Sequence, residues 1–124
     1  MNADEGVPVA DPIDRSRLEL LQGSGAGGDL VVELIELFVA DVPPRMQLIR
    51  DAVSAGDPEA LMRTAHSLKG SAATLGADGM AELCRRIEEI GRAGAVTPAA
   101  ELLDTLGDEF ERVKSAFGDW VAGR

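Results

Sequence analysis

Hydrophobic residues recur every three or four positions along most of the chain, which is the spacing of amphipathic helices. The segment 29–42, DLVVELIELFVADV, shows this pattern most clearly. Its predicted inward stripe consists of Leu30, Leu34, Leu37 and Phe38, widened by Val31, Ile35 and Val42. No segment alternates apolar and polar residues as a half-buried strand would, so the pattern predicts an all-α protein.

Proline, glycine and capping residues indicate where the predicted helices begin and end. Pro43 and Pro44 predict a break or a sharp bend, because neither has an N–H and each restricts the residue before it. The helical segment that follows them ends at Gly56. Asp14, Asp57 and Thr97 are predicted to cap the helices that follow them, and Gly76 and Gly94 to end the helices before them. These signals predict helices over residues 14–22, 58–75, 78–93 and from residue 98 onward. The glycine-rich run 23–28 ends the first of them.

Most connections between the predicted helices are short, which places consecutive helices side by side and antiparallel. We therefore expect an antiparallel up-down four-helix bundle with one or two short additional helices at the N-terminus. Residues 1–13 are acidic and contain two prolines, so they predict a flexible tail, and residues 14–121 predict the bundle domain. A chain of 124 residues has room for one such domain.

Composition and charge narrow the possible functions. Aromatic residues make up 3% of the chain and hydrophobic residues 45%, which suits a core of packed aliphatic helices. The net charge of −10 argues against nucleic acid, whose binding needs a basic surface, and against an anionic membrane surface. No apolar run approaches the roughly 20 residues of a membrane-spanning helix. We expect neither a nucleic-acid partner nor membrane insertion.

The cellular location is predicted from the N-terminus and the cysteine content. The N-terminus lacks the basic and apolar regions of a secretory signal. The single cysteine, Cys84, cannot form an internal disulfide, and it falls in the apolar stripe of its helix. A small buried side chain is therefore favoured over a reactive thiol. We expect a cytoplasmic monomer.

His66 is the only histidine, and its helical phase predicts that it faces solvent. The apolar stripe of its helix consists of Leu61, Ala65, Leu68, Ala72 and Leu75. At about 100° per residue, His66 lies roughly 140° from the centre of that stripe. This phase argues against a buried structural histidine and leaves either an inert surface residue or a functional one.

The neighbours of His66 favour a functional interpretation. Lys69 and Gly70 follow at positions i+3 and i+4, one turn further along the helix. A glycine within a helix costs about 0.5–1 kcal/mol relative to alanine, so we interpret Gly70 as leaving space beside the ring. Lys69 supplies a cation, and Ser71 adds a nearby hydroxyl. An exposed imidazole with a cation and open space suits acceptance of a bulky, dianionic phosphoryl group.

At these residues the sequence resembles the histidine-containing phosphotransfer (HPt) domain, the relay module of multistep two-component signalling. The matching residues are His66-Ser67-Leu68-Lys69-Gly70-Ser71, Leu75-Gly76, Cys84-Arg85-Arg86-Ile87-Glu88 and Gly91-Arg92. The specific motifs cover about two helices. A looser similarity in helix order and hydrophobic pattern extends over about residues 15–117.

The resemblance implies roles for the residues around the histidine. His66 would be phosphorylated reversibly by exchange with the aspartate of a receiver domain, with Lys69 supporting the phosphoryl charge and Gly70 permitting close approach. Arg92 stands where related domains often carry a basic residue. Glu88 departs from the pattern, because some relatives have a glutamine there that hydrogen-bonds the histidine. A carboxylate at this position would lie unfavourably close to a phosphoryl dianion.

The resemblance also implies that the chain is a phosphocarrier and not an autonomous enzyme. Mg²⁺ and the catalytic acidic pocket would come from the partner, so no cofactor or metal site is expected in this chain. The expected partners are response-regulator receiver domains, a hybrid histidine kinase, or both. The first residues favour a free-standing protein or a trimmed piece slightly over a domain of a hybrid kinase. The alternative function is a helical docking or adaptor module in which the histidine is incidental.

Overall fold

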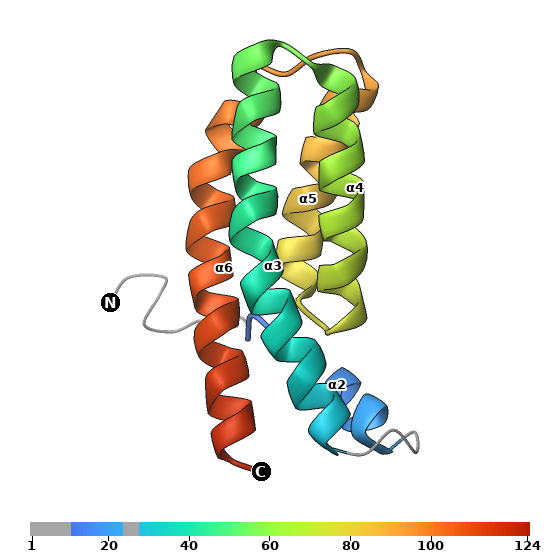
Figure 1. The fold of residues 1–124 in the computed structure, drawn as a ribbon, viewed down its shortest axis with the longest axis vertical. Helices are drawn as coiled ribbons and strands as arrows, with labels where there is room; N and C mark the ends of the chain where they lie inside the picture. Colours follow the sequence, from blue (N-terminus) through green and yellow to red (C-terminus); the bar gives the residue numbers. More distant parts are fainter. Residues whose placement is uncertain (1–10, 24–27) are drawn as a thin grey trace, which may run out of the picture.

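The computed structural model of the chain describes residues 11–23 and 28–124, which form helices joined by short turns. A short helix, α2 (Arg15–Leu21), precedes four long ones, and there is no strand in these two ranges. The long helices are α3 (Gly28–Ala55), α4 (Pro58–Thr74), α5 (Asp78–Arg92) and α6 (Ala99–Ala122). Figure 1 shows them side by side with alternating directions, and α2 beside the start of α3. The predicted all-α, up-down bundle is confirmed.

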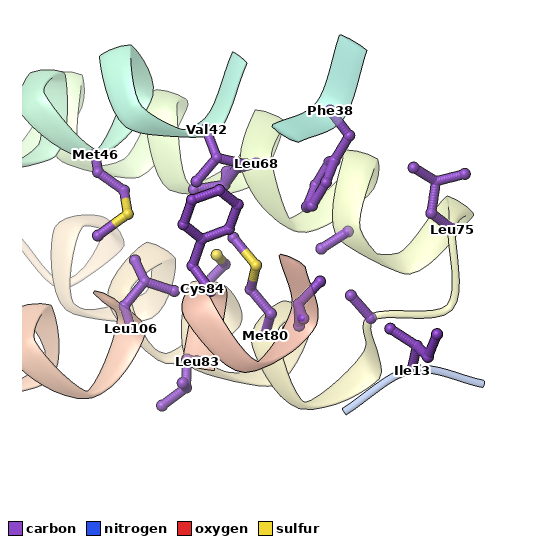
Figure 2. Packing of buried hydrophobic residues seen from close by; sticks show 14 of the residues in the cluster. Ile13, Phe38, Val42, Met46, Leu68, Leu75, Met80, Leu83, Cys84 and Leu106 are labelled. Atoms are coloured by element: carbon purple, nitrogen blue, oxygen red, sulfur yellow. The ribbon is translucent and has the colours of Figure 1, made fainter. Parts of the chain in front are cut away.

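The hydrophobic core fills the space between the four long helices. Figure 2 shows side chains from all four converging, among them Val42, Leu68, Cys84 and Leu106. The few aromatic residues gather at one place, where the rings of Phe110 and Phe117 meet Phe38 edge-on at centroid distances of 6.4 and 5.9 Å. Trp120 is buried in the same core.

The course of α3 differs from its prediction. The helix is continuous through Pro43 and Pro44, so the predicted break is wrong, although Figure 1 shows α3 changing direction along its length. Both prolines lie on the exposed side of the helix, where water can bind the carbonyl groups that they leave without a helical partner. The buried residues Val42 and Met46 on either side hold the helix against the bundle.

The buried face of α3 is also displaced from the predicted stripe. Leu30 and Leu37, predicted to point inward, are 41% and 67% exposed, and Leu34 is half-buried. The residues that face the core are Val31, Ile35, Phe38, Val42, Met46, Ile49 and Ala52, in steps of three and four. The segment carries two adjacent apolar stripes, and only the packing of the other helices decides which one is covered.

Most of the predicted helix ends are confirmed. Asp57 caps α4 by accepting a hydrogen bond from the backbone N–H of Ala60 at 3.1 Å. Gly76 and Gly94 follow α4 and α5 with φ angles of 81° and 82°, the left-handed region that favours glycine. The cap predicted at Thr97 is wrong, because this residue belongs to the turn before α6 and makes no side-chain cap bond.

The N-terminal segment is attached to the turn between α4 and α5. Asp14 caps α2 as predicted, and its backbone N–H donates to the carbonyl of Gly76 at 2.8 Å. Ile13 is 3% exposed and belongs to the core, so the predicted tail extends too far at this end. The remainder of that predicted tail, residues 1–10, lies outside the described residues, as do residues 24–27 of the glycine-rich run.

Candidate functional site

His66 lies on the exposed side of α4, as its helical phase predicts. The helix buries Leu61, Ala65, Leu68 and Ala72. The side chain of His66 is 67% exposed. A rigid, well-packed helix therefore presents the imidazole to an approaching molecule.

A buried carboxylate on α5 holds the side chains around this histidine. Glu88 is only 2% exposed, and its Oε2 lies 2.7 Å from Nδ1 of His66. Oε1 of the same group accepts a hydrogen bond from Nζ of Lys69 at 2.7 Å. Oε2 also accepts one from Nη2 of Arg92 at 2.8 Å. Three of the side chains that the sequence placed near the site, from two helices, thus meet at the carboxylate of a fourth.

The partners of Glu88 determine its charge. Burial by itself raises the pKa of this carboxyl, but the hydrogen bonds from Lys69 and His66 and their charges lower the pKa of Glu88 to about 2. The group is therefore ionised at neutral pH, and an ionised carboxylate only accepts hydrogen bonds. It follows that Nδ1 of His66 carries the proton in this contact. In the neutral ring, Nε2 is then the nitrogen with the free lone pair.

The approach of α5 to α4 depends on Gly91. A β-carbon at this buried position would lie 2.6 Å from the carbonyl oxygen of Pro58 and 2.8 Å from the backbone nitrogen of Met62. Any larger residue would push the start of α4 away from the end of α5. The sequence motif contains Gly91, but its packing role becomes evident only in the fold.

Gly70 and Ser71 differ in their surroundings. A β-carbon added at Gly70 would meet no atom within 4 Å, so the position is open surface on the helix that carries His66. The hydroxyl of Ser71 donates to the carbonyl of Ser67 in the preceding turn at 3.3 Å. Ser71 also borders a hollow between α3 and α4.

Arg45 of α3 is a neighbour of the site that the sequence did not reveal. Its Nη1 donates to the hydroxyl of Ser67, the residue directly after His66, while its Nε donates to Asp41. The contact joins residues that are 22 positions apart. No local pattern in α3 signals it, because it depends on how α3 packs against α4.

The described residues give little support for a metal site, a reactive cysteine or a membrane-spanning helix. No group of three or more histidine, cysteine, aspartate or glutamate side chains there could hold a metal ion. Cys84 is buried as predicted, and burial raises the pKa of its thiol to about 12, which makes it a poor nucleophile. None of the helices α2 to α6 is long and apolar enough to cross a membrane.

A helical bundle that presents one histidine on the exposed side of a helix is the arrangement of a histidine phosphotransfer domain. Residues 33–116 match the family model of the Hpt domain, and the chain belongs to this family. The crystal structure of histidine-containing phosphotransfer protein B (HptB) from Pseudomonas aeruginosa PAO1 is similar, with a TM-score of 0.82 and 33% identity. The similarity covers 90% of this chain and 95% of that one.

Curated relatives agree with this assignment. The phosphorelay protein LuxU of Vibrio vulnificus, from strains YJ016 and CMCP6, is 25% identical over 96 residues. These residues make up 77% of this chain and 84% of LuxU. The chain therefore functions in histidine phosphotransfer within a phosphorelay, as a carrier and not as an autonomous enzyme. Hpt domains in phosphorelays interact with receiver domains and kinases, and this membership favours phosphotransfer over the adaptor alternative.

Proposed function

We propose that His66 carries the phosphoryl group and that Nε2 of its ring is the atom that receives it. The observation behind this proposal is the exposed ring whose Nδ1 lies 2.7 Å from the buried carboxylate of Glu88. The carboxylate holds the ring in one tautomer and one orientation. The free lone pair on Nε2 is then available to a phosphoryl donor.

In the proposed step, the lone pair of Nε2 attacks the phosphorus of an aspartyl phosphate on a receiver domain. An N–P bond forms, the P–O bond to the aspartyl carboxyl group breaks, and the aspartate leaves as a carboxylate. The ring keeps its Nδ1 proton and becomes positively charged, so its hydrogen bond to Glu88 is strengthened. The reverse sequence of bond changes passes the phosphoryl group to the aspartate of another receiver.

The surrounding charges suit a phosphoryl dianion. Glu88 contributes one negative charge, whereas Lys69 and Arg92, both bonded to it, contribute two positive charges. The cations therefore outweigh the carboxylate, and this balance supports acceptance of a phosphoryl dianion beside Glu88. We assign charge support to Lys69, with Arg92 as a second source. Gly70 keeps the neighbouring surface open for the donor.

The other groups that phosphoryl transfer needs would come from the partner receiver domain. Phosphoryl transfer depends mainly on positioning and on charge stabilisation, and we propose that a receiver domain supplies Mg²⁺ and an acidic pocket. One copy of the chain carries the complete His66 site, so we propose that the monomer is the active form. We place it in the cytoplasm, together with its receivers.

Incubation with a phosphorylated receiver domain tests the proposal. Wild-type protein is expected to gain acid-labile phosphate, and His66→Gln protein is expected to gain none. Circular dichroism of the variant verifies that it is folded, which the exposure of His66 leads us to expect. Equal labelling of the two proteins would show that another residue carries the phosphoryl group.

A further inference from the structure

An apolar hollow lies between α3 and α6, which run in opposite directions (Figure 1). Its volume is about 550 Å³, and the residues that border it fall within 32–40 of α3 and 114–122 of α6. The buried side chains Ile35 and Phe117 border it together with the half-buried Val39 and Val121. We call this hollow the α3–α6 groove. Apolar surface that other helices of the chain leave uncovered marks an interaction site.

The α3–α6 groove lies across the bundle from His66. Each long helix packs against two neighbours, in the order α3, α4, α5, α6 and back to α3. His66 and Glu88 belong to the pair α4 and α5, which is opposite the pair α3 and α6. On α3 itself, Val39 of the groove lies about 200° around the helix from Leu37, which borders the hollow toward α4. A molecule bound in the groove therefore leaves His66 accessible.

The groove has one acidic and one basic wall. Its charged residues are Glu36 on α3 and Lys114 on α6, and both are exposed. Within the described residues Glu36 forms no ion pair, and Lys114 forms one with Glu111 on its own helix, at 3.1 Å. An exposed pair of this kind contributes little to stability. Both charges are therefore available to a partner.

This arrangement of charges is complementary to itself. If two copies face each other across a two-fold axis parallel to the groove, α3 of each copy lies opposite α6 of the other. Glu36 of one copy then faces Lys114 of the second copy, and the same contact occurs twice. Each helix also lies antiparallel to the helix opposite it, as in an up-down four-helix bundle. The apolar walls of the two grooves would enclose a shared core.

We propose that the α3–α6 groove is a self-association surface through which two copies of the chain form a reversible dimer. Burial of the apolar walls drives the association, and the two contacts between Glu36 and Lys114 set its register. The groove extends over about two and a half turns of each helix, so the dimer is weak and depends on concentration. Each copy keeps a complete His66 site on its outer side, so one copy remains sufficient for phosphoryl transfer.

Ala40→Glu tests this surface, with Ala100→Glu as the matched control. Ala40 is an exposed residue of the groove, and Ala100 is an exposed residue of α6 away from the groove. Each change adds the same charge and volume without opening the core. Sedimentation equilibrium from about 1 μM to about 1 mM covers the range of weak complexes. We expect wild type and Ala100→Glu to dimerise alike, and the dissociation constant to rise about tenfold or more in Ala40→Glu because a carboxylate enters the apolar contact.

Reversal of the two charges tests the register. Glu36→Lys and Lys114→Glu each place like charges opposite one another in a dimer of identical copies, so each protein alone should dimerise more weakly than wild type. In a mixture of the two proteins, the substituted positions face each other and so do the unchanged ones, with opposite charges in both contacts. We expect the mixture to form dimers with a dissociation constant close to that of wild type. Circular dichroism verifies that each variant is folded.

Three results would overturn the inference. Wild type that remains monomeric over the whole concentration range would show that a second copy does not occupy the groove. A wild-type dimer that is equally stable in Ala40→Glu would place the contact elsewhere. A mixture of Glu36→Lys and Lys114→Glu that dimerises no better than either protein alone would contradict the pairing of α3 with α6. All three results leave the role of His66 intact, because acceptance of phosphate is measured separately.

Discussion

Nδ1 of His66 on α4 lies 2.7 Å from Oε2 of Glu88 on α5, and the glutamate is 2% exposed whereas the histidine is 67% exposed. A buried anion therefore orients an exposed imidazole. The same carboxylate accepts hydrogen bonds from Lys69 and Arg92, so it places both cations beside the ring. This contact links the packing of α4 against α5 directly to the chemistry of the histidine.

Removal of the Glu88 carboxylate should slow the chemical step. In Glu88→Ala the Nδ1–H of His66 loses its acceptor, and hydrogen bonds to charged groups are worth about 1.5–3 kcal/mol. We expect the rate of phosphoryl acceptance at saturating receiver to fall about tenfold or more, measured by rapid quench. Glu89→Ala is the matched control, because Glu89 is exposed and pairs with Arg85. Equal rates in the two variants would contradict the orienting role.

The lowered pKa of Glu88 should make stability depend on pH. The carboxyl has a pKa of about 2 in the folded protein, against an ordinary value of 4.5. Between these values the unfolded chain binds more protons, so the free energy of unfolding rises with pH. The contribution of Glu88 should be fully present above about pH 4.5 and should be lost as the pH falls toward 2.

Urea unfolding of wild type and Glu88→Gln at several pH values measures this contribution. We expect the stability difference between the two proteins to shrink as the pH falls from 4 to 3. A difference that does not change with pH over the whole range would show that the carboxyl is not ionised preferentially in the folded state.

Gly91→Ala should destabilise the bundle and disturb the site. The new β-carbon would lie 2.6 Å from the carbonyl oxygen of Pro58, so α4 and α5 must separate locally. We expect a loss of about 1–3 kcal/mol in the free energy of unfolding, measured in urea. Gly118→Ala on α6 is the control, because its β-carbon meets no atom within 4 Å. Similar stability of both variants would contradict the close packing at Gly91.

Two substitutions at Gly70 should show that this position matters for the access of a receiver domain to His66 and not for folding. Gly70→Ala should stabilise the helix by about 0.5–1 kcal/mol, because the added β-carbon meets no atom within 4 Å. Gly70→Leu should remain folded by circular dichroism but accept phosphate from a receiver more slowly, because its side chain fills the open surface near His66. Gly118→Leu adds the same volume to α6 and should transfer at the wild-type rate. Unchanged transfer by Gly70→Leu would refute the access role.

Sequence periodicity was sufficient for the features that depend on local structure. The helical phase of α4 predicted that His66 is exposed, and Asp57 and Gly76 indicated where that helix begins and ends. Periodicity alone could not show which of the two apolar stripes of α3 is buried. The prediction that Leu37 lies in the core is therefore wrong. That choice depends on contacts with other helices.

The centre of the site could be predicted only in part. The resemblance places Glu88 near His66, but the burial of this glutamate and its 2.7 Å contact with the ring depend on how α5 packs against α4, because the two residues are 22 positions apart. The charge balance also depends on this geometry, because Lys69 and Arg92 reach the carboxylate from different helices. The sequence alone suggested repulsion between Glu88 and a phosphoryl group, whereas the structure surrounds the carboxylate with two cations.

The most direct test of the account is to identify the phosphorylated ring atom. Nitrogen NMR of the ¹⁵N-labelled, phosphorylated protein resolves the two ring nitrogens of its only histidine and their coupling to ³¹P. We expect coupling at Nε2 of His66 and a retained proton on Nδ1. Coupling at Nδ1, or phosphate on a residue other than His66, would contradict it.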